Sequence, residues 1–372
     1  MSLVSRLLIN LTLVIFCLGL VMVYNTTSGE LLDRMHEAGL IDSLVKQGTY
    51  GILGVMIAFV VYRLGHERLI RHAPVFFAVI CVFLVLVFVP KIGCTINGAK
   101  RWIRLLGLTF QPSELMKLAL PLFYIHYLQK KGDFSSVTRF LEVLAIMVVP
   151  IGLIFFEPDN GTALILTSTV IVMLFISRVP LKFWMVPILI CLSIAAVFAS
   201  RMPHVQNRIQ VYLDPEVDIL GKGHQPYQAK IAAGSGGLHG KGLGQSLQKY
   251  NYLPEARSDY ILAIFAEEFG FVGIIMLLVV YMAVTFLGFT IAMRAETQNQ
   301  FYLSATLSYL FAIQAFLNMG IVSGLLPSKG TSLPFMSQGG SSLIVNVVLI
   351  CLLVEIEEKR CKKKSAFELS RV

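Results

Sequence analysis

Charged residues are scarce in this chain: Asp, Glu, Lys and Arg make up 14% of its 372 residues, whereas 56% of the residues are hydrophobic. A soluble domain carries about 25% charged residues, because its surface must be hydrated. The shortage excludes a soluble enzyme, and we expect no nucleic-acid partner. Acids are the rarer sign, and the net charge of +9 favours contact with an anionic membrane lipid surface.

Cysteine patterns and phosphate-binding motifs are missing as well. The six cysteines fall mostly within apolar segments, and their spacing indicates neither a disulfide framework nor a metal site. The glycine-rich stretch 234–244 holds Lys241 and could let backbone amides approach a phosphate, but it has no Walker pattern. No small-residue cleavage site follows the first apolar run, so we expect that run to be retained as a signal anchor.

Long apolar segments are what the chain has in abundance. Most can cross a hydrocarbon core of about 30 Å as helices. Because a spanning helix satisfies its backbone internally, we predict an all-α integral membrane protein, a bundle of ten transmembrane helices forming a single domain over 1–372. The predicted spans are 7–24, 48–62, 75–89, 113–128, 140–156, 163–176, 181–199, 260–293, 302–325 and 341–354.

Lys and Arg in the short loops predict the orientation. They gather on one side of the predicted bundle, which the positive-inside rule makes cytoplasmic, and both termini lie there. The basic tail 355–372 could contact anionic lipid or be a solvated face. The opposite side carries the large loop 200–259, in which 206–213 could form an interfacial helix.

The short outer loop 91–104 is basic although the charge rule disfavours it there, so its cations need another explanation. Arg101, Trp102 and Arg104 fit an interfacial segment whose guanidinium groups reach phosphates, with simple headgroup contact as the alternative. In the next span, Glu114 and Lys117 stand three residues apart on one helix face. They could form a structural ion pair between helices or shape a substrate cavity.

Several further polar residues lie in or between apolar segments. In the tight turn 157–162, we expect Asp159 to accept backbone hydrogen bonds locally. Glu267 and Glu268 within an apolar segment suggest a hydrated groove. Gln314 and Asn318 share a helix face, which favours hydrogen bonding to a neighbouring helix.

Asp259 stands where the large loop meets the next span. An acid at that place could simply favour the helix dipole, with Ser258 as a cap. It could also do chemistry, because the loop 325–342, with Lys329, brings a third outer loop with positive charge. Our hypothesis is that Asp259 is the catalytic residue.

These motifs, taken in order, resemble the SEDS family of bacterial shape, elongation, division and sporulation proteins over nearly the whole chain. Within the family, the division branch is more similar than the elongation branch. The motifs are NGAKRWI at 97–103, QPSE at 111–114, PDNGT at 158–162, GSGG at 234–237, YLPEA at 252–256 with Asp259, LPSKG at 326–330 and GGSS at 339–342. The chain departs from the family at Glu157, where glutamine is usual, and at Ser258, Tyr260 and Gln338.

The resemblance implies a peptidoglycan glycosyltransferase that polymerises lipid II on the outer face of the bacterial cytoplasmic membrane, at the division septum. It places Asp259 on the family's catalytic acid. It implies a class B penicillin-binding transpeptidase and other division proteins as partners. Its candidate substrate-binding residues are Lys100, Arg101, Trp102, Arg104, Glu114, Lys117, Lys241, Glu255, Lys329 and Ser337.

The implied reaction converts an α-linked undecaprenyl-diphosphate donor into a β-1,4 bond, which requires inversion. One displacement with Asp259 as general base supplies it. The leaving diphosphate needs positive charge from Arg101, Arg104, Lys241, Lys329 or a divalent cation, Mg or Mn, with unknown ligands. The alternatives are a lipid II flippase, an elongation-type polymerase and an inactive scaffold. The absence of an internal repeat and the crowding of polar residues on one face favour chemistry over transport.

Overall fold

The computed structural model describes the chain except residues 35–37, 91, 97–98, 106–107, 133–136, 203–204, 207–209, 211, 213–222, 251–252, 254, 328–329 and 370–372. Each predicted span falls on a helix. The helices are α1 (Leu3–Arg34), α2 (Ala38–Leu64), α3 (His66–Leu86), α4 (Pro112–Lys131), α5 (Val137–Phe156), α6 (Asn160–Ile176), α7 (Leu181–Arg201), α9 (His224–Ser235), α10 (Ile261–Met293), α11 (Gln298–Val322) and α12 (Gly340–Leu369).

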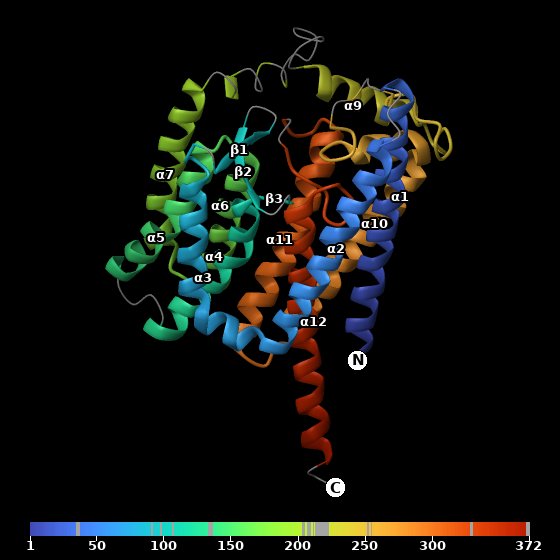
Figure 1. The fold of residues 1–372 in the computed structure, drawn as a ribbon. Helices are drawn as coiled ribbons and strands as arrows, with labels where there is room; N and C mark the ends of the chain where they lie inside the picture. Colours follow the sequence, from blue (N-terminus) through green and yellow to red (C-terminus); the bar gives the residue numbers. More distant parts are fainter. Residues whose placement is uncertain are drawn as a thin grey trace.

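The helices form one bundle, and the two termini lie at the same end of it (Figure 1). We call the opposite end, which carries α9 and a small sheet, the outer end. Among the described residues, eight helices are long and apolar enough to cross a membrane, and α6 is a shorter apolar helix. The all-helical membrane class is therefore confirmed, whereas the count of ten spans is not.

Helix α4 is a predicted span that is not among the eight helices apolar enough to cross a membrane. Its position in the bundle explains its lower hydrophobicity. It contributes Leu118 and Leu122 to one hydrophobic core, formed with α1, α2, α10, α11 and α12. It contributes Met116 and Leu120 to a second core, formed with α3, α5, α6 and α7. A helix that is surrounded by protein does not need an apolar face towards lipid.

A small antiparallel sheet was not predicted. It consists of β1 (Gly93–Ile96), β2 (Ala99–Leu105) and β3 (Leu108–Phe110), in that order. The register pairs Gly93 with Ile103 and Arg104 with Thr109. The hydroxyl of Tyr50 on α2 donates to the carbonyl of Thr109 and accepts from its N–H, both at 3.0 Å. The basic loop is thus a folded sheet that α2 holds in place.

Helix α10 is kinked at Gly270, where φ is 65°. The glycine-rich loop restores the hydrogen bonds that the kink removes: the N–H groups of Phe271 and Val272 donate to the carbonyls of Gly237 and Leu238, at 2.9 and 3.1 Å. A Cβ atom on Gly240 would lie 2.1 Å from the carbonyl oxygen of Glu268. The glycines therefore let loop backbone approach helix backbone, where the sequence had suggested a phosphate.

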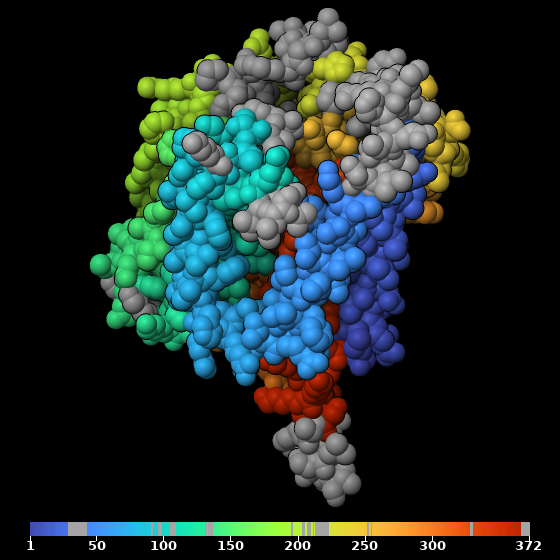
Figure 2. Space-filling view, viewed as in Figure 1, coloured from blue at the N-terminus to red at the C-terminus, as the bar shows by residue number. Residues whose placement is uncertain are grey.

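The chain differs from the sequence prediction at two more places. The segment 25–47 between the first two predicted spans is largely helical, because α1 runs to Arg34 and α2 begins at Ala38. Helix α12 continues past 354 through most of the predicted tail, and Figure 2 shows this extension leaving the bundle. Its first acid is buried, with Glu355 Oε2 lying 2.7 Å from His66 Nδ1. Most of the predicted interfacial helix 206–213 lies outside the described residues.

Candidate functional site at the outer end

Asp259 lies in the turn immediately before α10 and is half-buried. Its backbone carbonyl accepts a hydrogen bond of 2.9 Å from Asn318 Nδ2 on α11. Asn318 also donates to the carbonyl of Thr331 at 2.6 Å. The hydroxyl of Ser258 donates to Glu255 Oε2 at 2.5 Å, and the N-cap residue Tyr260 makes no side-chain cap. Tyr260, and not Ser258, is therefore the N-cap residue of α10.

The last outer loop lies against the carboxylate of Asp259. A Cβ atom on Gly330 would stand 3.0 Å from Asp259 Oδ2. A Cβ atom on Gly161, at the start of α6, would stand 3.0 Å from the side chain of Thr331 and 3.3 Å from the carbonyl of Gly330. The start of α6, the last outer loop and Asp259 are thus contiguous. Lys329 lies outside the described residues.

Asp159 organises the start of α6, as predicted. Its Oδ1 accepts from the N–H of Thr162 at 3.2 Å, which makes it the N-cap. Its Oδ2 accepts from Gln111 Nε2 at 2.9 Å and from Ser113 Oγ at 3.2 Å. Gln111 is the N-cap residue of α4 but makes no side-chain cap, and Pro112 occupies the first turn of α4, where its missing N–H costs nothing.

Arg101 joins the sheet to this turn. Its Nη2 donates to the carbonyl of Pro158 at 2.7 Å, and Nη1 lies 3.8 Å from Asp159 Oδ1. The side chain is 20% exposed. Its Nε has no hydrogen-bond partner among the described residues. The side chain is therefore partly exposed at the edge of the site, while its unpaired Nε is buried.

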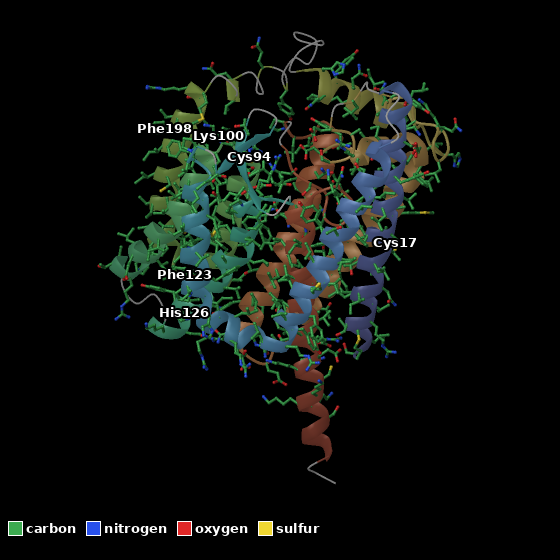
Figure 3. The ribbon with its side chains drawn as sticks, in the orientation of Figure 1. Cys17, Cys94, Lys100, Phe123, His126 and Phe198 are labelled. Carbon is green, nitrogen blue, oxygen red and sulfur yellow. The ribbon has the colours of Figure 1, made fainter. Side chains whose placement is uncertain are left out.

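The other predicted residues of β2 do not share the contacts of Arg101. The pairing with β1 skips Arg101, because Cys94 pairs with Trp102 and Thr95 with Lys100, so Arg101 lies at a β-bulge. The strand residues Ala99 and Ile103 are buried. Lys100 and Arg104 are exposed, and Figure 3 shows Lys100 at the outer end. The structure thus separates Arg101 from Arg104, which the sequence had grouped.

Glu157, next to this turn, is a buried acid that lacks hydrogen-bond donors in the described structure. Its side chain is fully buried, and neither carboxylate oxygen has a hydrogen-bond partner among the described residues. Burial and, after it, the charge of Asp159 raise the pKa of Glu157 to about 8, against a smaller opposing effect of Arg101. Glu157 is therefore protonated at neutral pH.

Glu114 and Lys117 form a structural ion pair, one of the two alternatives left open by the sequence. Lys117 Nζ lies 2.7 Å from Glu114 Oε1, and both side chains are buried. Lys117 Nζ also donates to Gln314 Oε1 on α11 at 2.9 Å. Gln314 and Asn318 thus bond to neighbouring elements as their spacing predicted, and α11 connects α4 to the Asp259 turn.

The ammonium group of Lys241 forms an ion pair with an acid of α10. Its Nζ lies 2.7 Å from Glu267 Oε1. Glu267 also accepts from the hydroxyls of Ser235 and Ser246 and from two backbone N–H groups. The expected hydrated groove at this acid is wrong: Glu267 and Glu268 are buried and hold the glycine-rich loop on α10.

Three residues that bind Glu268 were not found from the sequence: Asn25, Ser246 and Lys249. Glu268 Oε1 accepts from the N–H of Ser246 at 3.2 Å and lies 3.6 Å from Lys249 Nζ, and Oε2 accepts from Asn25 Nδ2 at 2.5 Å. Lys249 Nζ donates to Asn25 Oδ1 at 2.8 Å. Asn25 is 243 residues away from Glu268 in the chain, so no local pattern could have found it.

Glu255 and Ser337 occupy turns. Glu255 has a φ of 57°, and its backbone carbonyl accepts from the N–H groups of Ser258 and Tyr260. Ser337 is buried, and its hydroxyl accepts from the N–H of Leu333 at 2.8 Å. Both therefore shape the loops that surround Asp259.

Metal-binding capacity is limited within the described part of the chain. No group of three or more His, Cys, Asp or Glu side chains is placed to hold an ion there. A Mg²⁺ ion commonly binds through one or two carboxylates together with substrate phosphates, so Asp259 and a bound diphosphate would fit it.

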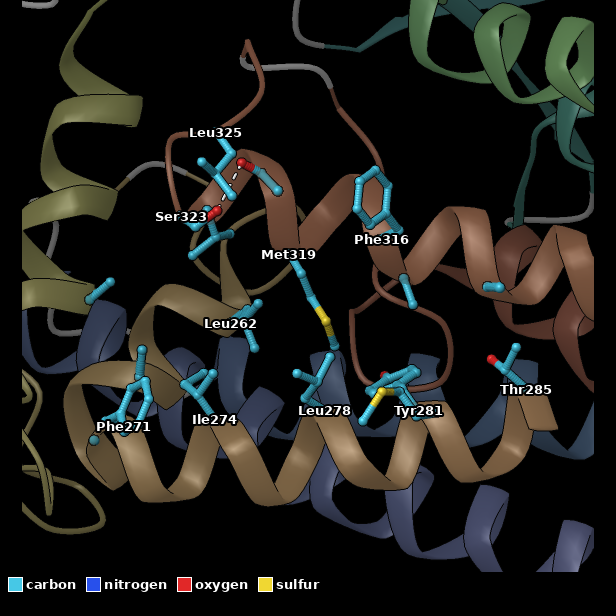
Figure 4. A pocket seen from close by; sticks show the side chains of 18 of the residues that line it. Leu262, Phe271, Ile274, Leu278, Tyr281, Thr285, Phe316, Met319, Ser323 and Leu325 are labelled. Carbon is cyan, nitrogen blue, oxygen red and sulfur yellow. Dashed lines mark hydrogen bonds between the residues drawn. The ribbon is translucent and has the colours of Figure 1, made fainter. Parts of the chain in front are cut away.

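A large apolar groove of about 940 Å³ opens between α10 and α11 (Figure 4). Its lining includes Leu262, one turn beyond Asp259, as well as Phe271, Tyr281 and Phe316. Its lining is too apolar to bind a diphosphate, and the groove is therefore separate from the polar site.

Comparison with known proteins relates the chain to a single family. The family model described as cell cycle protein, for FtsW, RodA and SpoVE, matches residues 5–362. The chain is 36% identical over 340 residues to the probable peptidoglycan glycosyltransferase FtsW of Trichlorobacter lovleyi, covering 91% of this chain and 89% of the relative. It is 35% identical over 365 residues to the protein of the same name from Legionella pneumophila, covering 96% and 92%.

Two solved structures share the fold. One is a chain of the structure named "Structural coordination of polymerization and crosslinking by a peptidoglycan synthase complex", with a TM-score of 0.75, 26% identity and coverage of 95% of this chain and 97% of that chain. The other is the rod shape determining protein RodA of Thermus thermophilus, with a TM-score of 0.69, 25% identity and coverage of 95% and 96%.

Proposed function

The chain belongs to the FtsW, RodA and SpoVE family of cell cycle proteins, and we propose that it is a peptidoglycan glycosyltransferase that polymerises lipid II. The observation that carries this proposal is the place of Asp259. Its carboxylate lies half-buried at the outer end, where the start of α6, the last outer loop and α10 meet. An acid held there can meet a membrane-anchored acceptor.

Asp259 acts as the general base. It accepts the proton of the acceptor 4-hydroxyl while that oxygen attacks the anomeric carbon of the donor and the undecaprenyl diphosphate leaves. A single displacement inverts the α-linked donor to a β-1,4 bond. The hydrogen bond from Asn318 to the Asp259 backbone fixes the turn without using the carboxylate.

Positive charge for the departing diphosphate comes first from Arg101. This guanidinium lies beside the same turn of α6 that contacts the Asp259 loop, and its Nε is unpaired within the described structure. Lys241 suits the role less, because Glu267 already neutralises it. Lys100 and Arg104 would act from the exposed side of β2. A divalent cation, Mg or Mn, would supply further charge when bound.

The division branch is favoured over the elongation branch, because the relatives with 35–36% identity carry the name FtsW. We infer that the outer end faces away from the cytoplasm, that both termini are cytoplasmic and that the protein works at the septum. A class B transpeptidase is the expected partner, since a similar chain belongs to a complex that couples polymerization to crosslinking. Transport is disfavoured, because Glu114, Lys117, Glu267 and Glu268 are buried in interactions with other protein groups.

Purified Asp259→Asn protein tests the proposal. It should make glycan polymer from lipid II at least about 10²-fold more slowly than wild type, because a positioned base contributes a factor of this size or more. Its thermal unfolding should be unchanged. Asp259→Glu is the matched control, and it should retain more activity than the amide. Wild-type polymerisation by Asp259→Asn would remove this residue from the mechanism, and lipid II flipping without polymerisation would favour transport.

A further inference from the structure

Three exposed leucines stand on the glycine-rich loop, and the proposed chemistry uses none of them. Leu238 is 66% exposed, Leu243 is 57% exposed and Leu247 is 61% exposed. They lie within ten residues of one another on a loop that is otherwise glycine and polar residues. Clustered apolar side chains on an exposed surface indicate a contact with lipid or with another protein.

The loop is attached to the lipid-facing side of α10. The backbone bonds from Phe271 to Gly237 and from Val272 to Leu238 place Leu238 level with the kink. From there on, α10 exposes large apolar side chains, including Phe271 at 59% and Met276 at 65%. Leu238 is therefore continuous with the face that α10 turns towards the bilayer, and the exposed Leu243 and Leu247 follow it on the same loop.

The depth of this attachment follows from the length of the helix. At 1.5 Å per residue, the segment from Phe271 to Met293 is about 34 Å long. The hydrocarbon core of a bilayer is about 30 Å thick, so Phe271 lies near its outer boundary. Figure 1 shows the loop beside the outer ends of α1 and α10, at the rim of the bundle and away from its centre.

The charges of the loop do not oppose contact with lipid. Lys241 is paired with Glu267, and the buried Lys249 lies 3.6 Å from Glu268. These bonds also hold the loop on α10, so that its leucines have a fixed position. The backbone bonds between the loop and α10 satisfy polar groups that lipid could not.

We propose that the segment 238–247 is an interfacial anchor, in which Leu238, Leu243 and Leu247 enter the bilayer leaflet at the outer end. The partner of this surface is the headgroup and acyl-chain boundary of that leaflet. The anchor holds the large loop at the membrane surface. It depends on the membrane fold and not on the proposed activity, so a failure of either one leaves the other untouched.

Site-directed fluorescence in bilayers tests the anchor. The full chain carries Cys17→Ala and Cys191→Ala, which remove the exposed native thiols, and one new cysteine from Leu243→Cys or Leu247→Cys. Each variant is labelled with nitrobenzoxadiazole and placed in phosphatidylethanolamine–phosphatidylglycerol nanodiscs. Lys100→Cys is the control, because Lys100 is exposed on the sheet. The labelled parent without a new cysteine gives the background.

Labels at 243 and 247 should be quenched by a nitroxide placed high on the lipid acyl chain and shielded from aqueous iodide, with lipid quenching about threefold or more above that of the label at 100. Iodide access equal to that of the control would overturn the proposal, since the leucines would then lie in water. Shielding from iodide without lipid quenching would overturn it too, because it would indicate a protein partner or a second copy.

Discussion

The buried acids Glu267 and Glu268 differ from the buried acid Glu157 in the hydrogen bonds that their carboxylate oxygens accept. All four carboxylate oxygens of Glu267 and Glu268 accept hydrogen bonds from the glycine-rich loop or from Asn25. Both oxygens of Glu157 are unpaired within the described structure. All three side chains are equally buried, but hydrogen-bond donors surround Glu267 and Glu268 and not Glu157 in the described structure. A buried acid that is surrounded by donors can hold neighbouring segments together, whereas burial without donors favours the neutral acid.

The comparison also separates the two neighbourhoods by role. Around Glu267 and Glu268, every cation is used to hold the loop on α10. Around Glu157, the guanidinium of Arg101 keeps an unpaired donor, and the loops that surround Asp259 lie alongside. The two neighbourhoods therefore differ in how completely their acids are hydrogen-bonded.

The largest effect is expected for Glu268→Ala. This change leaves Lys249, which is 4% exposed, without its carboxylate, and breaking such a buried pair costs about 3–5 kcal/mol. The free energy of unfolding from denaturant titration in mild detergent measures it. Glu157→Ala is the matched control and should cost less, because no hydrogen bond is lost. Equal costs would contradict the distinction between the two regions.

Next in size is the pH dependence caused by Glu157. Its pKa is raised from 4.5 to about 8 on folding, so the folded state binds the extra proton. Its stabilising contribution is complete below the unfolded pKa and is lost as pH rises through the folded pKa. Glu157→Gln, which keeps the shape of the neutral acid, should lose less stability than wild type between pH 5 and about pH 8. Parallel pH profiles of thermal unfolding would show that Glu157 is already ionised.

A smaller effect, confined to activity, is expected for Arg101→Met. Loss of the guanidinium should slow polymerisation of lipid II by about tenfold or more, because the diphosphate loses a positive charge. Arg104→Met removes an exposed charge of β2 and should slow the reaction less. Equal rates for the two variants would mean that the contact of Arg101 with the turn before α6 does not distinguish these residues.

Lys241→Met should have the smallest effect. Lys241 is 32% exposed, and Glu267 keeps four other donors, so the expected loss of stability is about 1 kcal/mol or less. The rate of polymerisation should stay at the wild-type value. A strong loss of turnover with unchanged stability would return Lys241 to the diphosphate site, from which its ion pair now separates it.

Much of the bundle could be predicted from the chain. Each predicted span lies on a helix, and the apolar runs alone were enough to place it. Gln314 and Asn318 also behaved as their four-residue spacing indicated. The small sheet could not be predicted in this way, because its strands are short and Tyr50, from a distant helix, holds them. The buried acids at the start of the predicted tail were missed for the same reason, since His66 lies 289 residues away from Glu355.

The sequence by itself determined the membrane class, the places of the helices, the family and the residue to test first, because apolar length and ordered motifs are local properties. Only the tertiary structure decided which partner each cation has. Lys241 lies 2.7 Å from Glu267, whereas Arg101 lies 3.8 Å from Asp159 and donates to the carbonyl of Pro158. Whether a charge has a partner depends on residues brought together across the bundle, and no local pattern records that.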